Sequence, residues 1–192
     1  ELTNLGKEYW KNKTLAEYMR PELVDDSVAA INLVAENYRN GVQVTWQIYS
    51  QEEIQADPSL GDAQLYYFPG KTPGGKYALV VPGNGSSMTS EMEEGGSTAA
   101  QLHEMGYTVF VLRYRTWMEM GNNAPLQDVA NAVRFITNHA DQFGVQPENY
   151  ALVGYSSGGQ IAGIFANKER GYGSYQVERP GALLLGYPVV DL

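Results

Sequence analysis

Short apolar runs recur through the second half of the chain. They are Tyr77–Val81, Tyr107–Leu112, Tyr150–Val153 and Ala182–Gly186. Continuous runs of this length, without polar alternation, are typical of strands that are covered on both faces of a sheet. The pattern therefore predicts four buried strands.

Helical patterns lie between these runs. A helix is expected from about Met92 to Met105, with Gly106 ending it. The next helix has Pro125 near its first turn and apolar positions spaced three and four apart, at Leu126, Val129, Val133, Ile136, Ala140 and Phe143. A third helix, rich in small residues, is expected from about Ser157. Strands that alternate with helices form parallel βαβ units, so the expected fold class is α/β with a mostly parallel, doubly wound sheet.

The part of the chain before Tyr77 has a different pattern. Two helical stretches are expected up to about Asn40, and Asp25 or Asp26 is a candidate N-cap for the second. Alternating apolar and polar residues in Val42–Tyr49 predict a half-buried strand, with Leu65–Phe68 as its neighbour. These two would be antiparallel edge strands of the sheet.

We expect one domain, 1–192, with an N-terminal helical segment at 1–40 and a sheet core at 41–192. The N-terminal helices would either cover the edge of the sheet where the parallel strands have their carboxyl ends, or pack against the side of the sheet.

Two further local patterns suggest a function at first sight. Gly70–Lys76 matches part of a phosphate-binding loop, but it precedes a strand where such a loop precedes a helix, so a hairpin turn is predicted. Glu91, Glu93 and Glu94 form an acidic cluster, which we interpret as a solvated helix start because negative charge is favoured there.

Composition narrows the classes of function. The formal net charge is −9, and no run of Lys and Arg is present, which argues against binding to nucleic acid. No apolar run is long enough to predict a membrane span. The absence of cysteine excludes disulfides and a Cys nucleophile, and fits a secreted location as well as a cytoplasmic one.

The strongest chemical signal is Gly154-Tyr155-Ser156-Ser157-Gly158, directly after the third buried strand. The Gly-x-Ser-x-Gly pattern at a strand-to-helix turn is typical of a nucleophile elbow, in which a tight turn exposes the serine hydroxyl. Ser156 is therefore the candidate catalytic nucleophile. The alternative is a glycine-rich turn with an incidental serine.

A glycine-rich loop, 82–87, follows the first buried strand. The carboxyl ends of parallel strands share one edge of the sheet, so this loop is expected to lie beside Ser156. Its backbone N–H groups could stabilise an oxyanion, although an ordinary flexible turn would have the same composition.

With these motifs, Tyr77–Leu192 resembles the carboxylesterase and lipase branch of the α/β-hydrolases, including hormone-sensitive-lipase-like and acetyl-xylan or feruloyl esterase-like enzymes. The resemblance rests on VVPGNGSS, FVLRYR, GVQPENYALVGYSSGGQIA and LLLGYPVVDL. It implies oxyanion donors at the N–H groups of Asn84, Gly85 and Ser157. In that family the first motif is usually His-Gly-Gly-Gly, whereas here Pro82 and Asn84 replace the His and one Gly. No cofactor or metal is implied.

A serine nucleophile needs a base, and the order in the family is Ser, acid, His. No histidine follows Ser156, and His103 and His139 are both expected at helix ends on the opposite edge of the sheet. Asp191 follows the fourth strand at the active edge, where it is either a candidate acid or a loop residue. We therefore expect the acid and base beyond this chain, an α/β-hydrolase fold that is incomplete at its C-terminus, and a natural protein that continues past Leu192.

The predicted function is hydrolysis of carboxylic esters, with short-chain or carbohydrate-linked acyl groups, through an acyl-enzyme on Ser156. The expected partner is a small-molecule or carbohydrate ester substrate, and these 192 residues alone are predicted to be inactive. The alternatives are a related serine peptidase and a catalytically inactive α/β-hydrolase fold that serves for binding.

Overall fold

The computed structural model describes residues 14, 17, 20–83, 90–116 and 123–190. Within these residues, six strands form one mixed sheet in the order β1-β2-β4-β3-β5-β6. The strands are β1 (Thr45–Gln47), β2 (Gln64–Phe68), β3 (Tyr77–Val81), β4 (Thr108–Arg113), β5 (Ala151–Tyr155) and β6 (Ala182–Gly186). β4, β3, β5 and β6 run parallel, whereas β1 and β2 are antiparallel to their neighbours, as predicted.

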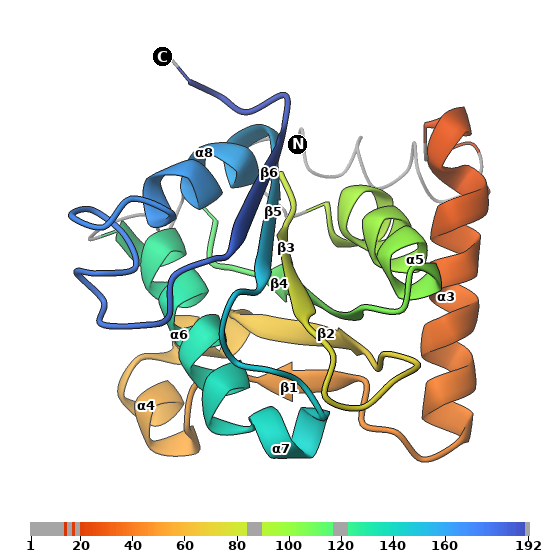
Figure 1. Cartoon of the computed structure of the whole chain (residues 1–192), viewed down its shortest axis with the longest axis horizontal. Coiled ribbons are helices and arrows are strands. Elements are labelled where there is room, and N and C mark those ends of the chain that lie inside the picture. The colour runs from red at the N-terminus through yellow and green to blue at the C-terminus, as the bar shows by residue number, and fades with distance from the viewer. Residues whose placement is uncertain (1–13, 15–16, 18–19, 84–89, 117–122, 191–192) are drawn as a thin grey trace, which may run out of the picture.

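Helices cover both faces of the sheet (Figure 1). On one side lie α3 (Val24–Arg39) and α5 (Ser97–Glu104), preceded by the π-helical segment η3 (Glu91–Gly96); on the other side lie α6 (Ala124–Asn138), α7 (Ala140–Phe143) and α8 (Ser156–Phe165). Two short 3-10 segments, η1 (Pro21–Leu23) and η2 (Pro58–Asp62), and a short helix, α4 (Gln51–Ala56), complete the elements. The doubly wound α/β architecture is therefore confirmed.

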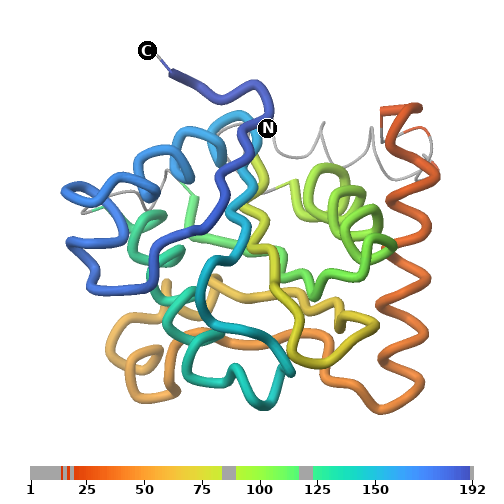
Figure 2. Tube along the Cα trace, viewed as in Figure 1, coloured from red at the N-terminus to blue at the C-terminus, as the bar shows by residue number. Residues whose placement is uncertain are grey.

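The core has two halves because successive side chains of a strand point to opposite faces. In β3, Leu79 and Val81 pack with α6 and α8, whereas Ala78 and Val80 pack with α3 and α5. All five residues of β3 are buried, as the continuous apolar run predicted. In the tube view, β3, β5 and β6 run side by side although they are far apart in sequence (Figure 2).

Helix ends agree partly with the predicted ones. Gly106 has a φ of +94° just beyond α5, as expected of a residue that ends a helix, and α6 begins with Pro125 in its first turn. Asp25 and Asp26 are not N-caps: α3 continues directly from η1, with Leu23 as its N-cap, so both carboxylates lie inside the first turn. α3 contacts α5 and η3, so this described helix packs against the side of the domain.

Two further predictions were wrong. The segment around Gly70–Lys76 is not a hairpin turn, because β2 pairs with β4 and the chain passes β4 to reach β3. β6 is a strand but not a buried one, since Leu183, Leu184 and Leu185 are 40%, 49% and 41% exposed. β6 is the last strand in the sheet order, with β5 as its partner on one side. None of the helices that the structure describes is long and apolar enough to cross a membrane.

Candidate active site

Ser156 lies at the turn between β5 and α8, and its φ is +50°. A non-glycine residue in this left-handed region is uncommon and costs of order 1–3 kcal/mol, so such residues persist where the surrounding structure holds them. Strand, strained serine and helix follow one another as a nucleophile elbow requires.

The glycines on either side of Ser156 permit the close approach of strand and helix. A Cβ on Gly154 would lie 2.6 Å from Gly158 O and 2.7 Å from Ala162 Cβ. A Cβ on Gly158 would lie 2.2 Å from Val81 O and 2.3 Å from Pro82 O. The start of α8 therefore rests directly against the end of β3, and only glycine fits at these two positions.

The chain leaving β3 passes beside the candidate nucleophile. A Cβ on Gly83 would lie 2.9 Å from Ser156 Cβ, so the predicted proximity of the glycine-rich loop and Ser156 is confirmed for its described part. The Ser90 N–H donates to Gly83 O at 2.7 Å, which brings the two ends of the intervening segment together. Asn84 and Gly85, two of the three predicted oxyanion donors, lie outside the described residues. Ser157, the third, is the second residue of α8, where N–H groups point out of the helix N-terminus.

The residues after β4 pack beneath the end of β3 and make buried polar contacts there. Tyr114 is buried, and its hydroxyl donates to Pro82 O at 2.8 Å. Burial raises the pKa of Tyr114 well above its ordinary value, so it remains a donor at physiological pH. Arg115 and Asp128, at 5% and 0% exposure, form a buried ion pair with Nη2 and Oδ1 at 2.7 Å, and Tyr49 donates to Asp128 at 2.6 Å.

The loop after β6 also reaches the elbow. The Val189 N–H donates to Ser156 O at 3.1 Å, and Pro188 Cβ would lie 3.0 Å from a Cβ on Gly159. Tyr187, with a φ of +37°, starts this loop. Asp191, the candidate acid, lies outside the described residues.

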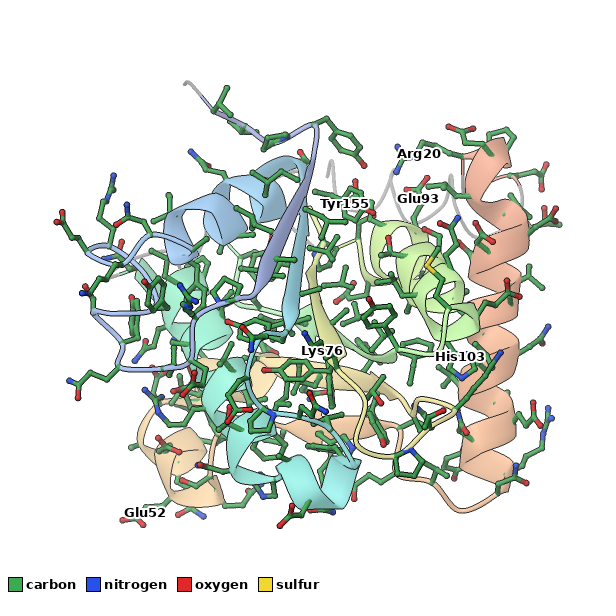
Figure 3. All side chains as sticks on the ribbon, viewed as in Figure 1. Arg20, Glu52, Lys76, Glu93, His103 and Tyr155 are labelled. Carbon is green, nitrogen blue, oxygen red and sulfur yellow. The ribbon has the colours of Figure 1, made fainter. Side chains whose placement is uncertain are left out.

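The acidic cluster is not simply a solvated helix start. Glu94 is only 11% exposed at its side chain, and its Oε2 accepts the Gly83 N–H at 2.6 Å, while its Oε1 accepts the Tyr187 hydroxyl at 2.7 Å. Glu93 accepts from Arg20 Nε at 2.9 Å (Figure 3), and Glu91 lies 3.6 Å from Arg113. The interpretation as solvation therefore fails for Glu94, whose partners are two loops of the site.

A cavity of about 280 Å³ opens beside this cluster. Arg20, Glu94, Thr98, Tyr155 and Tyr187 are among its lining residues. Thr98 Oγ1 donates to the Tyr155 hydroxyl at 2.9 Å, so the residue before Ser156 is held by α5. The cavity therefore has both aromatic and charged walls.

Both histidines lie away from Ser156. His103 is near the C-terminal end of α5, close to Pro69 and Lys71, and Figure 3 shows it far from Tyr155. Burial, followed by the charge of Lys71, lowers the pKa of His103. His139 caps the end of α6, with its Nδ1 2.8 Å from Phe135 O. Their predicted placement at the ends of these two helices is confirmed, and neither is positioned to take a proton from Ser156.

Comparisons with known proteins identify the family and the fold. The model of the BD-FAE family matches residues 66–176. An acetylxylan esterase of Xylanibacter ruminicola is 30% identical over 133 residues, which cover 69% of this chain. Two solved structures share the fold: an α/β-hydrolase from a Medee basin deep-sea metagenome library (26% identity, 67% of this chain, TM-score 0.55) and an acetyl ester-xyloside bifunctional hydrolase of Caldicellulosiruptor lactoaceticus (24% identity, 76% of this chain, TM-score 0.62).

The matched relatives are longer than this chain. The aligned region is 26% of the Xylanibacter esterase, 52% of the metagenomic hydrolase and 57% of the Caldicellulosiruptor enzyme. The similarity therefore concerns the part of each relative that this chain covers.

Proposed function

Because the chain belongs to the BD-FAE family and has the α/β-hydrolase fold, we propose that it carries the nucleophile and oxyanion site of a carboxylic ester hydrolase. The observation that carries the proposal is the positive φ of Ser156 at the turn from β5 to α8. A serine is not needed for a turn of this kind, where glycine would be unstrained. The strain is accounted for if the hydroxyl has to stand above the edge of the sheet.

In the proposed reaction, Ser156 Oγ attacks the ester carbonyl while a base takes its proton. The N–H groups of Asn84, Gly85 and Ser157 stabilise the resulting oxyanion. Collapse of the tetrahedral intermediate breaks the bond to the alcohol oxygen, which leaves with the proton from the base. Water then attacks the acyl-serine by the same steps, releasing the carboxylic acid and regenerating the serine.

We do not assign the base to His103 or His139, because each lies at the C-terminal end of its helix, α5 or α6, whereas Ser156 follows the carboxyl end of β5. They are the two histidines in the sequence, so a histidine base would come from outside these 192 residues. This absence also favours the second candidate, a hydrolase fold without activity that serves for binding. A serine peptidase would use the same residues and differ in its leaving group.

For the substrate, we propose short acyl groups, acetyl above all, attached to a carbohydrate. The support is similarity to a protein named acetylxylan esterase. Acetylated xylan and an aryl acetate are therefore the substrates to test first, with a peptide amide to test the peptidase alternative.

A fluorophosphonate probe tests the nucleophile directly. In the complete natural protein, wild type should label, Ser156→Ala should lose labelling by at least about 100-fold, and the neighbouring Ser157→Ala should still label because its backbone N–H remains. Labelling that survives Ser156→Ala would refute the assignment. A folded wild type that neither labels nor hydrolyses acetyl esters would instead favour the binding protein.

A further inference from the structure

Glu94 links three separate parts of the chain through one carboxylate. Its Oε2 accepts the backbone N–H of Gly83, at the end of β3, at 2.6 Å. Its Oε1 accepts the hydroxyl of Tyr187, in the loop after β6, at 2.7 Å, and lies 3.6 Å from Arg20 Nη2. The bond to Gly83 is partly buried, whereas the bond to Tyr187 is exposed, so the charge of the carboxylate strengthens the bond to Gly83 more.

This carboxylate is adjacent to the candidate nucleophile. The position that a Cβ on Gly83 would occupy is 2.9 Å from Ser156 Cβ and 3.0 Å from Glu94 Oε2, so Gly83 lies between the two side chains. The absence of a Cβ at Gly83 allows this approach. The acceptor at Gly83 N–H also means that this N–H is not an oxyanion donor, which leaves that role to the residues after it.

Both backbone polar groups of Gly83 are bonded to the segment around η3, the N–H to Glu94 and the carbonyl oxygen to Ser90. Asn84 follows Gly83 directly, and the Ser90 N–H donates to Gly83 O at 2.7 Å. Gly83, the residue before the proposed donors Asn84 and Gly85, is therefore fixed on both sides of its backbone. Preorganised donors lose much of their effect when they are displaced, and a shift of about 1 Å can cost about 100-fold in rate.

Arg20 and Tyr187 hold the carboxylate in place. Arg20 Nη2 is 3.4 Å from the Tyr187 hydroxyl, while its Nε and its backbone N–H both bond to Glu93 Oε1 at 2.9 Å (Figure 3). The guanidinium also supplies positive charge near a carboxylate that would otherwise oppose a developing oxyanion.

We propose that Glu94 is a positioning residue for the ester hydrolysis proposed above: its carboxylate holds Gly83, at the end of β3, and Tyr187, in the loop after β6, beside Ser156. This inference rests on the proposed function for its effect on rate. Its structural part, the bond between the Glu94 carboxylate and Gly83, is independent of activity.

The kinetic test compares Glu94→Ala, Glu94→Gln and the control Glu91→Ala in the complete natural protein. Glu91 lies in the same segment η3 and pairs with Arg113, away from Gly83. Glu94→Ala should lower kcat for an aryl acetate about 10- to 100-fold, with KM within about 3-fold, because donors are displaced in the transition state. Glu94→Gln should stay within about 5-fold of wild type, since its amide oxygen can accept from Gly83 and its NH₂ can donate to the Tyr187 oxygen. Glu91→Ala should match wild type.

Hydrogen exchange tests the structural part without any need for turnover. The backbone amides of Gly83 and Ser90 should exchange at least about 10-fold faster in Glu94→Ala than in wild type, with no such change in Glu91→Ala. If Glu94→Ala does not fold, Tyr187→Phe, which removes one hydroxyl, should show a smaller increase at the same two amides.

Unchanged exchange in a folded Glu94→Ala, or an equal effect of Glu91→Ala, would overturn the inference. Unchanged kcat in an active protein would overturn its kinetic part. If only the proposed function is wrong, the result differs: the wild type shows no Ser156-dependent hydrolysis, while its amide hydrogen exchange still depends on Glu94.

Discussion

The contact between α8 and β3 gives a sharp test of the elbow, because α8 contains a matched pair of glycines. Gly158→Ala would place a methyl group 2.2 Å from Val81 O and 2.3 Å from Pro82 O. Gly163→Ala adds the same methyl group to the same helix, where the nearest atom, Leu185 Cδ1, is 3.8 Å away. The two variants therefore differ in steric fit while sharing their chemistry.

The expected magnitudes follow from this geometry. Replacing Gly by Ala within a helix is favourable by about 0.8–1 kcal/mol, which should be the whole effect of Gly163→Ala. Overpacking costs typically about 1–3 kcal/mol, and Gly158→Ala should reach the upper end because the opposing atoms belong to the backbone and cannot rotate away. We expect Gly158→Ala to lose about 3 kcal/mol, so the free energies of unfolding of the two variants should differ by about 4 kcal/mol.

Urea denaturation, followed by circular dichroism, measures both free energies. For a chain of this size, a difference of about 4 kcal/mol corresponds to about 8–16 °C in Tm. If Gly158→Ala is as stable as Gly163→Ala within about 0.5 kcal/mol, with the same m-value, the close approach of α8 to β3 is refuted.

Two other predictions concern stability. Asp128→Ala should lower the free energy of unfolding by about 3–5 kcal/mol, because the Arg115 guanidinium then stays buried without its carboxylate partner. Asp128→Leu combined with Arg115→Met should recover most of this loss. A cost below about 1 kcal/mol for Asp128→Ala would contradict the role of the pair. The folded state lowers the pKa of His103, so below about pH 6.5 the unfolded chain binds more protons than the folded protein. The urea midpoint should therefore fall as the pH drops through that value and on through the folded pKa, and the fall should be shallower in His103→Gln. Parallel pH profiles for the two proteins would contradict this reasoning.

Local sequence patterns predicted those elements whose conformation is determined by residues close to them in the chain. The apolar run of β3, the turn at Gly106 and the sequence from β5 through Ser156 to α8 each follow from neighbouring residues, and the structure agrees with them. The burial of β6 could not be predicted in this way. Its leucines have the composition of a covered strand, whereas their exposure depends on what lies next to the strand in space.

The residues that support the site were missed for a similar reason. Glu94 has the sequence context of an ordinary acidic helix start, and its partners Gly83 and Tyr187, 11 and 93 residues away, belong to other elements. Asp128 did carry a signal. It falls on the buried stripe of α6 between Pro125 and Val129, where a carboxylate needs a partner, and Arg115 in the FVLRYR motif is that partner. A carboxylate on the apolar stripe of a helix therefore predicts a buried cation, and here the arginine that follows a buried strand supplies it.

The hydrogen bond from Ser90 to Gly83 joins the end of β3 to the start of η3, two points that are close together in the chain. The entropic cost of closing a loop grows with the logarithm of its length, by about 0.6 kcal/mol for each doubling, so this junction costs less chain entropy than a contact between distant segments. The part of the site beside Ser156 that depends on Gly83 and Ser90 can therefore form from local chain before the loop after β6 is in place.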